Sequence, residues 1–157
     1  MNYSDSERVA SILEQCGFVQ EKEDQCPDLQ VVNTCSVRQK SEDKAYGFIV
    51  QKKKDCPKVL IAVTGCMVRQ TGDRTNSKDE LLKHDPIDLV FRIEDTARLP
   101  KLLEPHFPDH DFSSFFQRSS NLGCLQFALD PEQNYFHVNP KVENKAQVLV
   151  PIMQGCN

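Results

Sequence analysis

The chain has 157 residues, of which 39% are hydrophobic and 8% aromatic, so it can form one domain of ordinary size and a tail. Its formal charge of −4 excludes the broad basic surface that drives non-specific nucleic-acid binding. No apolar run approaches the length of a membrane span, and the polar, acidic beginning is unlike a signal peptide. These features predict a cytoplasmic protein without membrane contact.

The sequence of residues 1–64 predicts a helix followed by two strands with another helix between them. Ser4-x-x-Glu7 is typical of a helix start, and Gly17 follows an apolar stripe where a helix would end. Residues 29–32 are rich in β-branched side chains and predict a strand. Residues 59–64 are nearly all apolar, as in a parallel strand that is buried on both faces.

The intervening helix is expected to be capped by Ser36 and to end in a solvated lysine run, residues 52–54. Its expected buried stripe consists of Ala45, Phe48 and Ile49. Further on, Ser77-x-x-Glu80 predicts a short helix, residues 88–91 a strand, and residues 95–103 a helix with Pro100 in its first turn. Alternating elements of this kind predict an α/β domain with an open, mostly parallel, flavodoxin- or Rossmann-like sheet flanked by helices.

The first helix has no strand before it, so the first strand of such a sheet is expected to be missing. Residues 105–145 mix prolines, serines and scattered aromatics, which indicates a long irregular linker. An apolar strand then returns over residues 147–153, just before the chain stops. The pattern divides the chain into a domain over 1–104, a linker over 105–145 and the start of another domain over 146–157.

Two of the seven cysteines follow the two clearest strands, Cys35 through Asn33-Thr34 and Cys66 through Gly65. Ligands of parallel sheets bind beyond the carboxyl ends of the strands, so both thiols are expected at the same edge. By position alone, metal ligation and simple burial are equally good interpretations. Two thiols are fewer than the four ligands that a closed zinc or iron–sulfur site requires.

The remaining cysteines and the histidines carry no comparable signal. Cys16 falls on an apolar helix face, and none of the others has a partner at metal-binding spacing: Cys26, Cys56 and Cys124. In a reducing compartment, disulfides are not expected for them. The histidines also lack the spacing of metal ligands: His84, His106, His110 and His137.

Three separated segments, VVNTCSVRQKSEDKAYG, VTGCMVRQ and VPIMQGCN, occur in order, each at the end of a predicted strand. Together they resemble the methylthiotransferases, a radical-SAM enzyme family, and NTCSVRQKSEDK is similar to the branch that acts on tRNA. The beginning, MNYSDSE, resembles the family motif GCxMNxxDSE entered after its cysteine. The resemblance covers most of residues 1–103 and resumes at the end.

This resemblance implies two 4Fe-4S clusters in the whole enzyme. Cys35 and Cys66 match the second and third cysteines of an auxiliary cluster, whose first cysteine would precede Met1. Cys156 matches the first cysteine of the CxxxCxxC loop that holds the S-adenosylmethionine cluster, and residues 147–153 match the first strand of its barrel. The chain is therefore expected to be an N-terminal fragment that contains no catalytic residue and is inactive alone.

The resemblance also implies the reaction of the full-length enzyme. An adenosyl radical made from S-adenosylmethionine, with electrons from a donor protein, activates C2 of N6-isopentenyladenosine beside the tRNA anticodon, and a methylthio group is added there. Within the family, the alternative substrates are threonylcarbamoyladenosine in tRNA or a ribosomal-protein aspartate. Outside it, the alternative is a non-catalytic α/β binding module with buried thiols.

Overall fold

The computed structural model describes residues 3–21, 25–35, 39–113 and 115. They divide into two compact units: residues 21–92, called the sheet unit, and residues 3–20 with 93–115, called the helical unit. Within these ranges, no helix is both long and apolar enough to cross a bilayer. The expected strand over 147–153 and most of the expected linker lie outside the described residues, as do Cys124 and Cys156.

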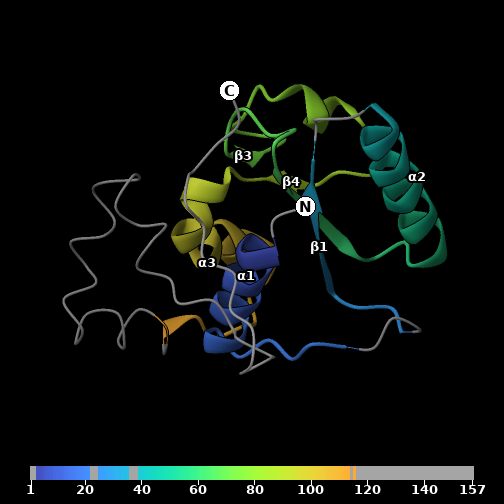
Figure 1. The fold of residues 1–157 in the computed structure, drawn as a ribbon. Helices are drawn as coiled ribbons and strands as arrows, with labels where there is room; N and C mark the ends of the chain where they lie inside the picture. Colours follow the sequence, from blue (N-terminus) through green and yellow to red (C-terminus); the bar gives the residue numbers. More distant parts are fainter. Residues whose placement is uncertain (1–2, 22–24, 36–38, 114, 116–157) are drawn as a thin grey trace, which may run out of the picture. The chain divides into compact units, whose positions relative to one another are not determined.

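The sheet unit contains a sheet with the strand order β1-β2-β4-β3 (Figure 1). Its strands are β1 (Leu29–Thr34), β2 (Leu60–Gly65), β3 (Gly72–Asp73) and β4 (Leu89–Val90). β2 pairs in parallel with β1 on one side and with β4 on the other, and β3 runs antiparallel to β4. The mostly parallel α/β sheet is thus confirmed. The sequence does not predict β3, because two residues are too short to show a strand period.

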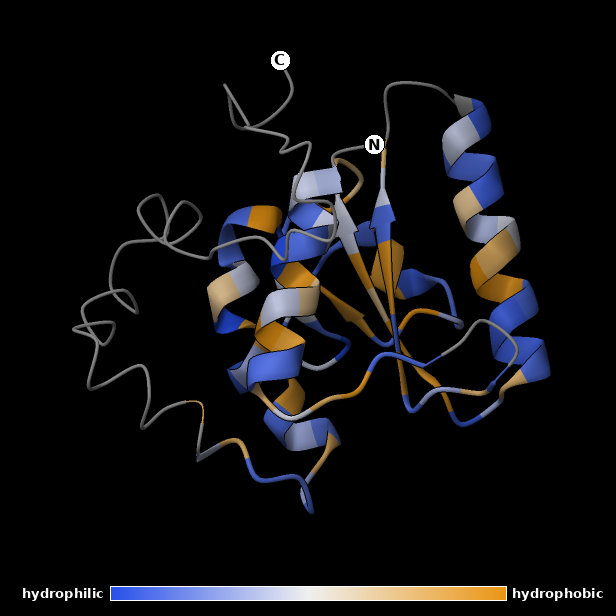
Figure 2. Ribbon diagram, turned by 60° about the horizontal axis from the view of Figure 1, so that its bottom comes forward, coloured by the Kyte–Doolittle hydropathy of each residue, from blue (hydrophilic) through white to orange (hydrophobic). Residues whose placement is uncertain are grey.

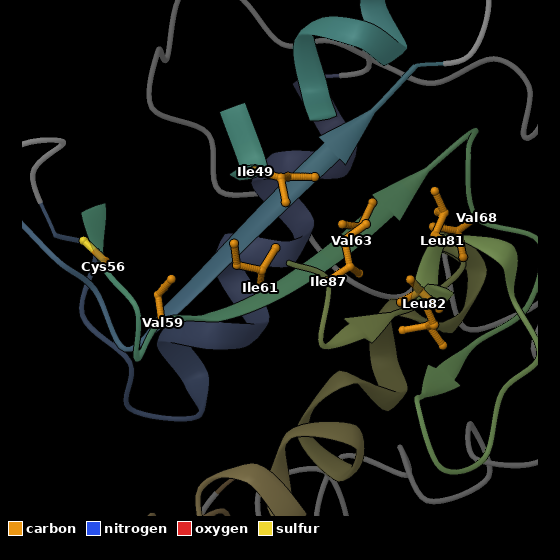
Figure 3. Close-up of a cluster of buried hydrophobic side chains, with 10 residues drawn as sticks. Ile49, Cys56, Val59, Ile61, Val63, Val68, Leu81, Leu82 and Ile87 are labelled. Carbon is orange, nitrogen blue, oxygen red and sulfur yellow. The ribbon is translucent and has the colours of Figure 1, made fainter. Parts of the chain in front are cut away.

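β2 runs through the middle of this sheet, and its sequence explains the position. Ile61, Ala62 and Val63 are completely buried, as expected of a strand covered on both faces. Ile61 and Val63 belong to a cluster of buried side chains drawn from the strands, the loops beside them and two helices (Figure 3). Figure 2 shows the same concentration of hydrophobic residues along the strands. Burial of this apolar area is the main stabilising contribution to the unit.

The helix α2 (Gln39–Asp55) packs on β1 and sends Ile49 into that cluster (Figure 3). The predicted buried stripe is correct for Ile49 and wrong for Phe48, which keeps 49% of its surface exposed. Adjacent residues lie about 100° apart around a helix, so Phe48 points well away from the direction in which Ile49 packs. Ala45 is half-buried, and Ser36 lies outside the described residues.

The lysine run at the end of α2 is only partly solvated, which corrects the sequence expectation. Lys53 Nζ lies 2.8 Å from Asp88 Oδ2 and donates to the Val59 carbonyl at 2.6 Å. The same carboxylate oxygen accepts from the Ile61 amide at 2.9 Å. Lys53 therefore ties the end of α2 to the beginning of β2, while the neighbouring Lys54 is exposed.

The loop after β2 leads into the 3-10 helix η1 (Glu80–Lys83), whose N-cap is Asp79 and not the predicted Ser77. The buried Asp79 carboxylate accepts from the amides of Arg69 at 2.7 Å, Gln70 at 2.9 Å and Leu81 at 3.0 Å. It thus satisfies backbone donors on both sides of the loop. The predicted short helix exists, but it is a 3-10 helix and begins later than the pattern suggests.

The helical unit combines α1 (Tyr3–Gln15) with η2 (Ile93–Arg98), α3 (Leu99–Leu103) and η3 (Glu104–His106). Ser4 lies inside the first turn of α1, where its hydroxyl accepts from the Arg8 guanidinium, so the predicted capping role of Ser4 is wrong. The predicted end of the helix is confirmed. Gly17 has a φ of 91°, and the Phe18 amide donates to the Leu13 carbonyl at 3.0 Å, which closes the last turn.

The segment that follows η3 packs back onto the end of α1. The His110 ring lies with its centroid 4.5 Å from that of Phe18 and 4.7 Å from that of Phe112. His110 Nε2 lies 2.7 Å from the carbonyl oxygen of Cys16, one of the acceptors that the end of a helix leaves without an intrahelical donor. Residues of the expected linker therefore take part in the packing of the helical unit.

We expect His110→Ala to lower the free energy of unfolding by about 1–2 kcal/mol, because it removes both the ring packing and the hydrogen bond to Cys16. His110→Phe keeps an aromatic ring and should lose about half of that amount. Urea denaturation followed by circular dichroism measures both variants. Equal stabilities of His110→Ala and the parent chain would show that this segment does not stabilise α1.

Candidate functional site

The two cysteines singled out in the sequence lie at one edge of the sheet. β1 ends at Thr34 and β2 at Gly65, and these two residues are partners in the parallel register. Cys35 directly follows β1 and Cys66 directly follows β2. The Cys66 amide donates to the Thr34 carbonyl at 3.1 Å. No strand separates them, so they follow neighbouring strands, whose spacing in sheets is about 4.8 Å.

The backbone at this edge is held closely by Thr34 and Gly65. The Thr34 hydroxyl donates to the Thr64 carbonyl at 2.7 Å, which joins the ends of the two strands. Gly65 has a φ of 99°, and a Cβ atom placed there would lie 2.2 Å from the Thr34 carbonyl oxygen. Only glycine permits both this conformation and this approach. The glycine signal is visible in the sequence, whereas nothing there indicates the role of the Thr34 hydroxyl.

Neither cysteine at this edge is disulfide-bonded, and the two differ in exposure. Cys66 is exposed and Cys35 is half-buried. Both residues therefore combine fixed backbone positions with full or partial exposure after the carboxyl ends of their strands, where open parallel sheets bind their ligands. Thiolates are the usual ligands of iron–sulfur clusters and of structural zinc.

The sequence predicts that the helix after Cys35 directs its first amides toward this edge, where they would favour a thiolate or an anionic cluster. α2 begins at Gln39, and residues 36–38 between the cysteine and the helix lie outside the described residues. The orientation of those amides thus stays a prediction. On the β2 side, the loop that follows Cys66 is held by Asp79, which accepts from the amides of Arg69 and Gln70. The sequence does not single out Asp79, because Ser77-x-x-Glu80 matches the capping pattern and favours Ser77 as the N-cap.

Cys16 is confirmed as a core residue. Its side chain is 2% exposed, and burial raises the pKa of its thiol to about 12. Because only the thiolate binds metal or attacks electrophiles, Cys16 is an inert thiol at neutral pH.

The expectation that Cys26 and Cys56 do not form a disulfide is wrong. The two residues form a disulfide, with their Cα atoms 5.5 Å apart and a sequence separation of 30. Composition and spacing cannot reveal this pair, because it forms only when the segments before β1 and β2 are brought together by the sheet.

The donors at the Cys35–Cys66 edge fit part of an iron–sulfur ligand set. In the portion of the chain that the structure describes, no three His, Cys, Asp or Glu side chains come close enough to hold one metal ion. None of the described histidines therefore completes a set with Cys35 and Cys66. The edge offers two thiols, which match two ligands of a cluster and leave the others to come from elsewhere.

Comparison with known proteins places this chain in a family. Residues 1–91 match the model of a family described as uncharacterized protein family UPF0004. The matched range contains β1, β2 and both cysteines of the sheet edge. No solved structure matches the chain.

Several relatives carry the name tRNA-2-methylthio-N(6)-dimethylallyladenosine synthase. The protein from Carboxydothermus hydrogenoformans is 32% identical over 160 residues, covering 100% of this chain and 33% of its own length. The protein from Geobacter metallireducens is 34% identical over 164 residues, with the same coverage. The protein from Corynebacterium glutamicum is 38% identical over 108 residues, 66% of this chain and 20% of its own. The chain thus spans about a third of the length of the first two relatives.

Proposed function

Because the chain belongs to the methylthiotransferase family, we propose that it is the N-terminal part of a tRNA methylthiotransferase and holds an auxiliary 4Fe-4S cluster. The relatives' shared name supports a substrate of the dimethylallyladenosine (isopentenyladenosine) type in tRNA. The cytoplasmic location and the division into 1–104, 105–145 and 146–157 stay predictions.

The observation that carries this proposal is the position of Cys35 and Cys66 after two directly paired strands. Two ligands of one cluster must approach the same group of iron atoms, and neighbouring strand ends bring thiols close enough for that. The strand register sets this proximity before any metal binds, so little backbone rearrangement would be needed. An arrangement at opposite ends of the sheet would have excluded a shared cluster.

In the proposed mechanism, the chain's own residues hold and orient the cluster. Cys35 and Cys66 supply thiolates, while Gly65 and the Thr34 hydroxyl keep the two strand ends in contact. A cluster held there would supply the site from which the sulfur group is transferred. The protein contributes position, access and control of the cluster's surroundings.

The other parts of the reaction are proposed for the longer protein. Cys156 would be the first ligand of a second cluster that binds S-adenosylmethionine, and an electron donor protein would reduce it. The net charge of −4 means that tRNA would be held mainly by segments outside this chain. The chain spans about a third of its relatives' length, so we propose that it is inactive alone.

Anaerobic reconstitution with iron and sulfide tests the cluster site. We expect the chain to take up iron weakly and labilely, because two thiols leave the cluster open to exchange. Cys35→Ala and Cys66→Ala should each lose most of that iron. The readout is the bound iron and sulfide that remain after gel filtration. The absorbance of the thiolate-to-iron charge-transfer bands is measured on the same samples.

Cys16→Ala is the control, since Cys16 is a free cysteine of the helical unit that belongs neither to the Cys35–Cys66 edge nor to the Cys26–Cys56 disulfide. It should leave the iron content unchanged. If Cys35→Ala and Cys66→Ala bind as much iron as Cys16→Ala, these two residues are not ligands. That result would favour the non-catalytic binding module.

A further inference from the structure

A second pair of cysteines lies at the opposite ends of the same two strands. Cys26 comes three residues before Leu29, Cys56 comes four before Leu60, and Leu29 and Leu60 are the first partners of the β1–β2 register. The disulfide between Cys26 and Cys56 thus joins the amino ends of the two strands that carry Cys35 and Cys66 at their carboxyl ends.

Hydrogen bonds bring the segments of Cys26 and Cys56 together independently of the covalent bond. Lys52 Nζ donates to the Gln25 carbonyl at 3.2 Å, and the Cys56 amide donates to the Lys52 carbonyl at 2.8 Å. Immediately before the strands, the Leu60 amide donates to the Asp28 carbonyl at 2.9 Å. The two sulfurs would therefore stay close in the reduced chain.

The surroundings also suit a reduced Cys26. Its sulfur lies 3.7 Å from the carbonyl oxygen of Asp55, a distance at which a thiol donates a weak hydrogen bond. Cys26 is exposed, whereas Cys56 is 5% exposed and packs in the core cluster of the sheet unit. An external reagent therefore reaches the sulfur of Cys26 first.

We propose that Cys26 and Cys56 form a reversible redox site that exchanges with low-molecular-weight disulfides of the glutathione type. The Cys26 thiolate attacks such a disulfide, RSSR, forming a mixed disulfide and releasing one RSH after proton uptake. The Cys56 thiolate then attacks the Cys26 sulfur and releases the second RSH. The dithiol is oxidised by two electrons and RSSR is reduced to two RSH, and excess RSH reverses both steps.

Closing the Cys26–Cys56 bond stabilises β1, the strand that Cys35 directly follows. Among the described strands, β1 pairs only with β2, so its attachment depends on one ladder and on the segment before it. The crosslink spans 30 residues and restricts the unfolded chain while leaving the folded contacts in place. Oxidation therefore holds the edge strand on the sheet, and reduction loosens it. This inference does not depend on the cluster proposal.

The test equilibrates the metal-free chain anaerobically in glutathione buffers of different ratios, from fully reduced to fully oxidised. Thiols are then alkylated, and peptides are mapped by mass spectrometry without reduction. We expect the Cys26–Cys56 linked peptide to appear with oxidised glutathione and to disappear with reduced glutathione. We further expect the midpoint of thermal unfolding to be roughly 10 °C higher for the oxidised chain. Amide exchange in β1 should be slower in that state.

Cys26→Ser is the main variant, because an exposed position tolerates the change. It should unfold at the same temperature in both buffers, near the reduced parent chain. Cys16→Ala is the control, since it changes a buried cysteine outside the pair and should keep the full shift. Alkylation of both Cys26 and Cys56 in oxidised glutathione, or a redox shift that persists in Cys26→Ser, would overturn the proposal.

Discussion

Gly65→Ala is expected to lower the free energy of unfolding by roughly 3–5 kcal/mol. Gly65 has a φ of 99°, and the added Cβ would lie 2.2 Å from the carbonyl oxygen and 2.8 Å from the nitrogen of Thr34. Both neighbouring atoms belong to the backbone of the paired strand, so they cannot move aside as a flexible side chain would. Relief therefore requires that β1 and β2 separate at their carboxyl ends. Urea denaturation measures the loss.

The same change should reduce iron uptake, because the separation occurs where Cys35 and Cys66 follow the two strands. Gly47→Ala is the matched control. Gly47 lies in the interior of α2, and a Cβ placed there meets nothing within 4 Å. That substitution should raise stability by about 0.5–1 kcal/mol, since alanine favours a helix over glycine. If both variants are equally stable, the close contact at Gly65 does not constrain the strand ends.

Asp79→Ala is expected to cost roughly 3 kcal/mol, because it removes a buried carboxylate that accepts from backbone amides on both sides of the loop. Oδ2 of Asp79 accepts from the amides of Arg69 and Gln70, and Oδ1 accepts from that of Leu81. Asp79→Asn keeps one of these oxygens and should lose about half as much. Thermal and urea unfolding distinguish the two variants.

Asp85→Ala provides the comparison for Asp79→Ala. The Asp85 side chain is fully exposed and lies 3.6 Å from the Arg74 guanidinium, an ion pair of the kind that contributes little in water. Its removal should leave stability almost unchanged. If Asp79→Ala behaved like Asp85→Ala, the loop after Cys66 would not depend on the Asp79 carboxylate.

Local patterns in the sequence determined several features that the structure confirms. β2 was predicted because an uninterrupted apolar run suits a strand buried on both faces. The end of α1 was predicted because glycine at Gly17 permits the positive φ that closes the last turn. Placing Cys35 and Cys66 after strand ends required only the strands themselves. Each of these signals lies within a few consecutive residues.

The tertiary structure decided the features that depend on residues far apart in the chain. The direct pairing of β1 with β2 makes Cys35 and Cys66 neighbours, and the same register brings Cys26 to Cys56 across 30 residues. The exposure of Phe48 follows from which face of α2 meets β1. Sequence periodicity reports which side chains share a face, but it does not report which partner covers that face. Strand order, register and long-range thiol pairing arise only when distant segments pack together.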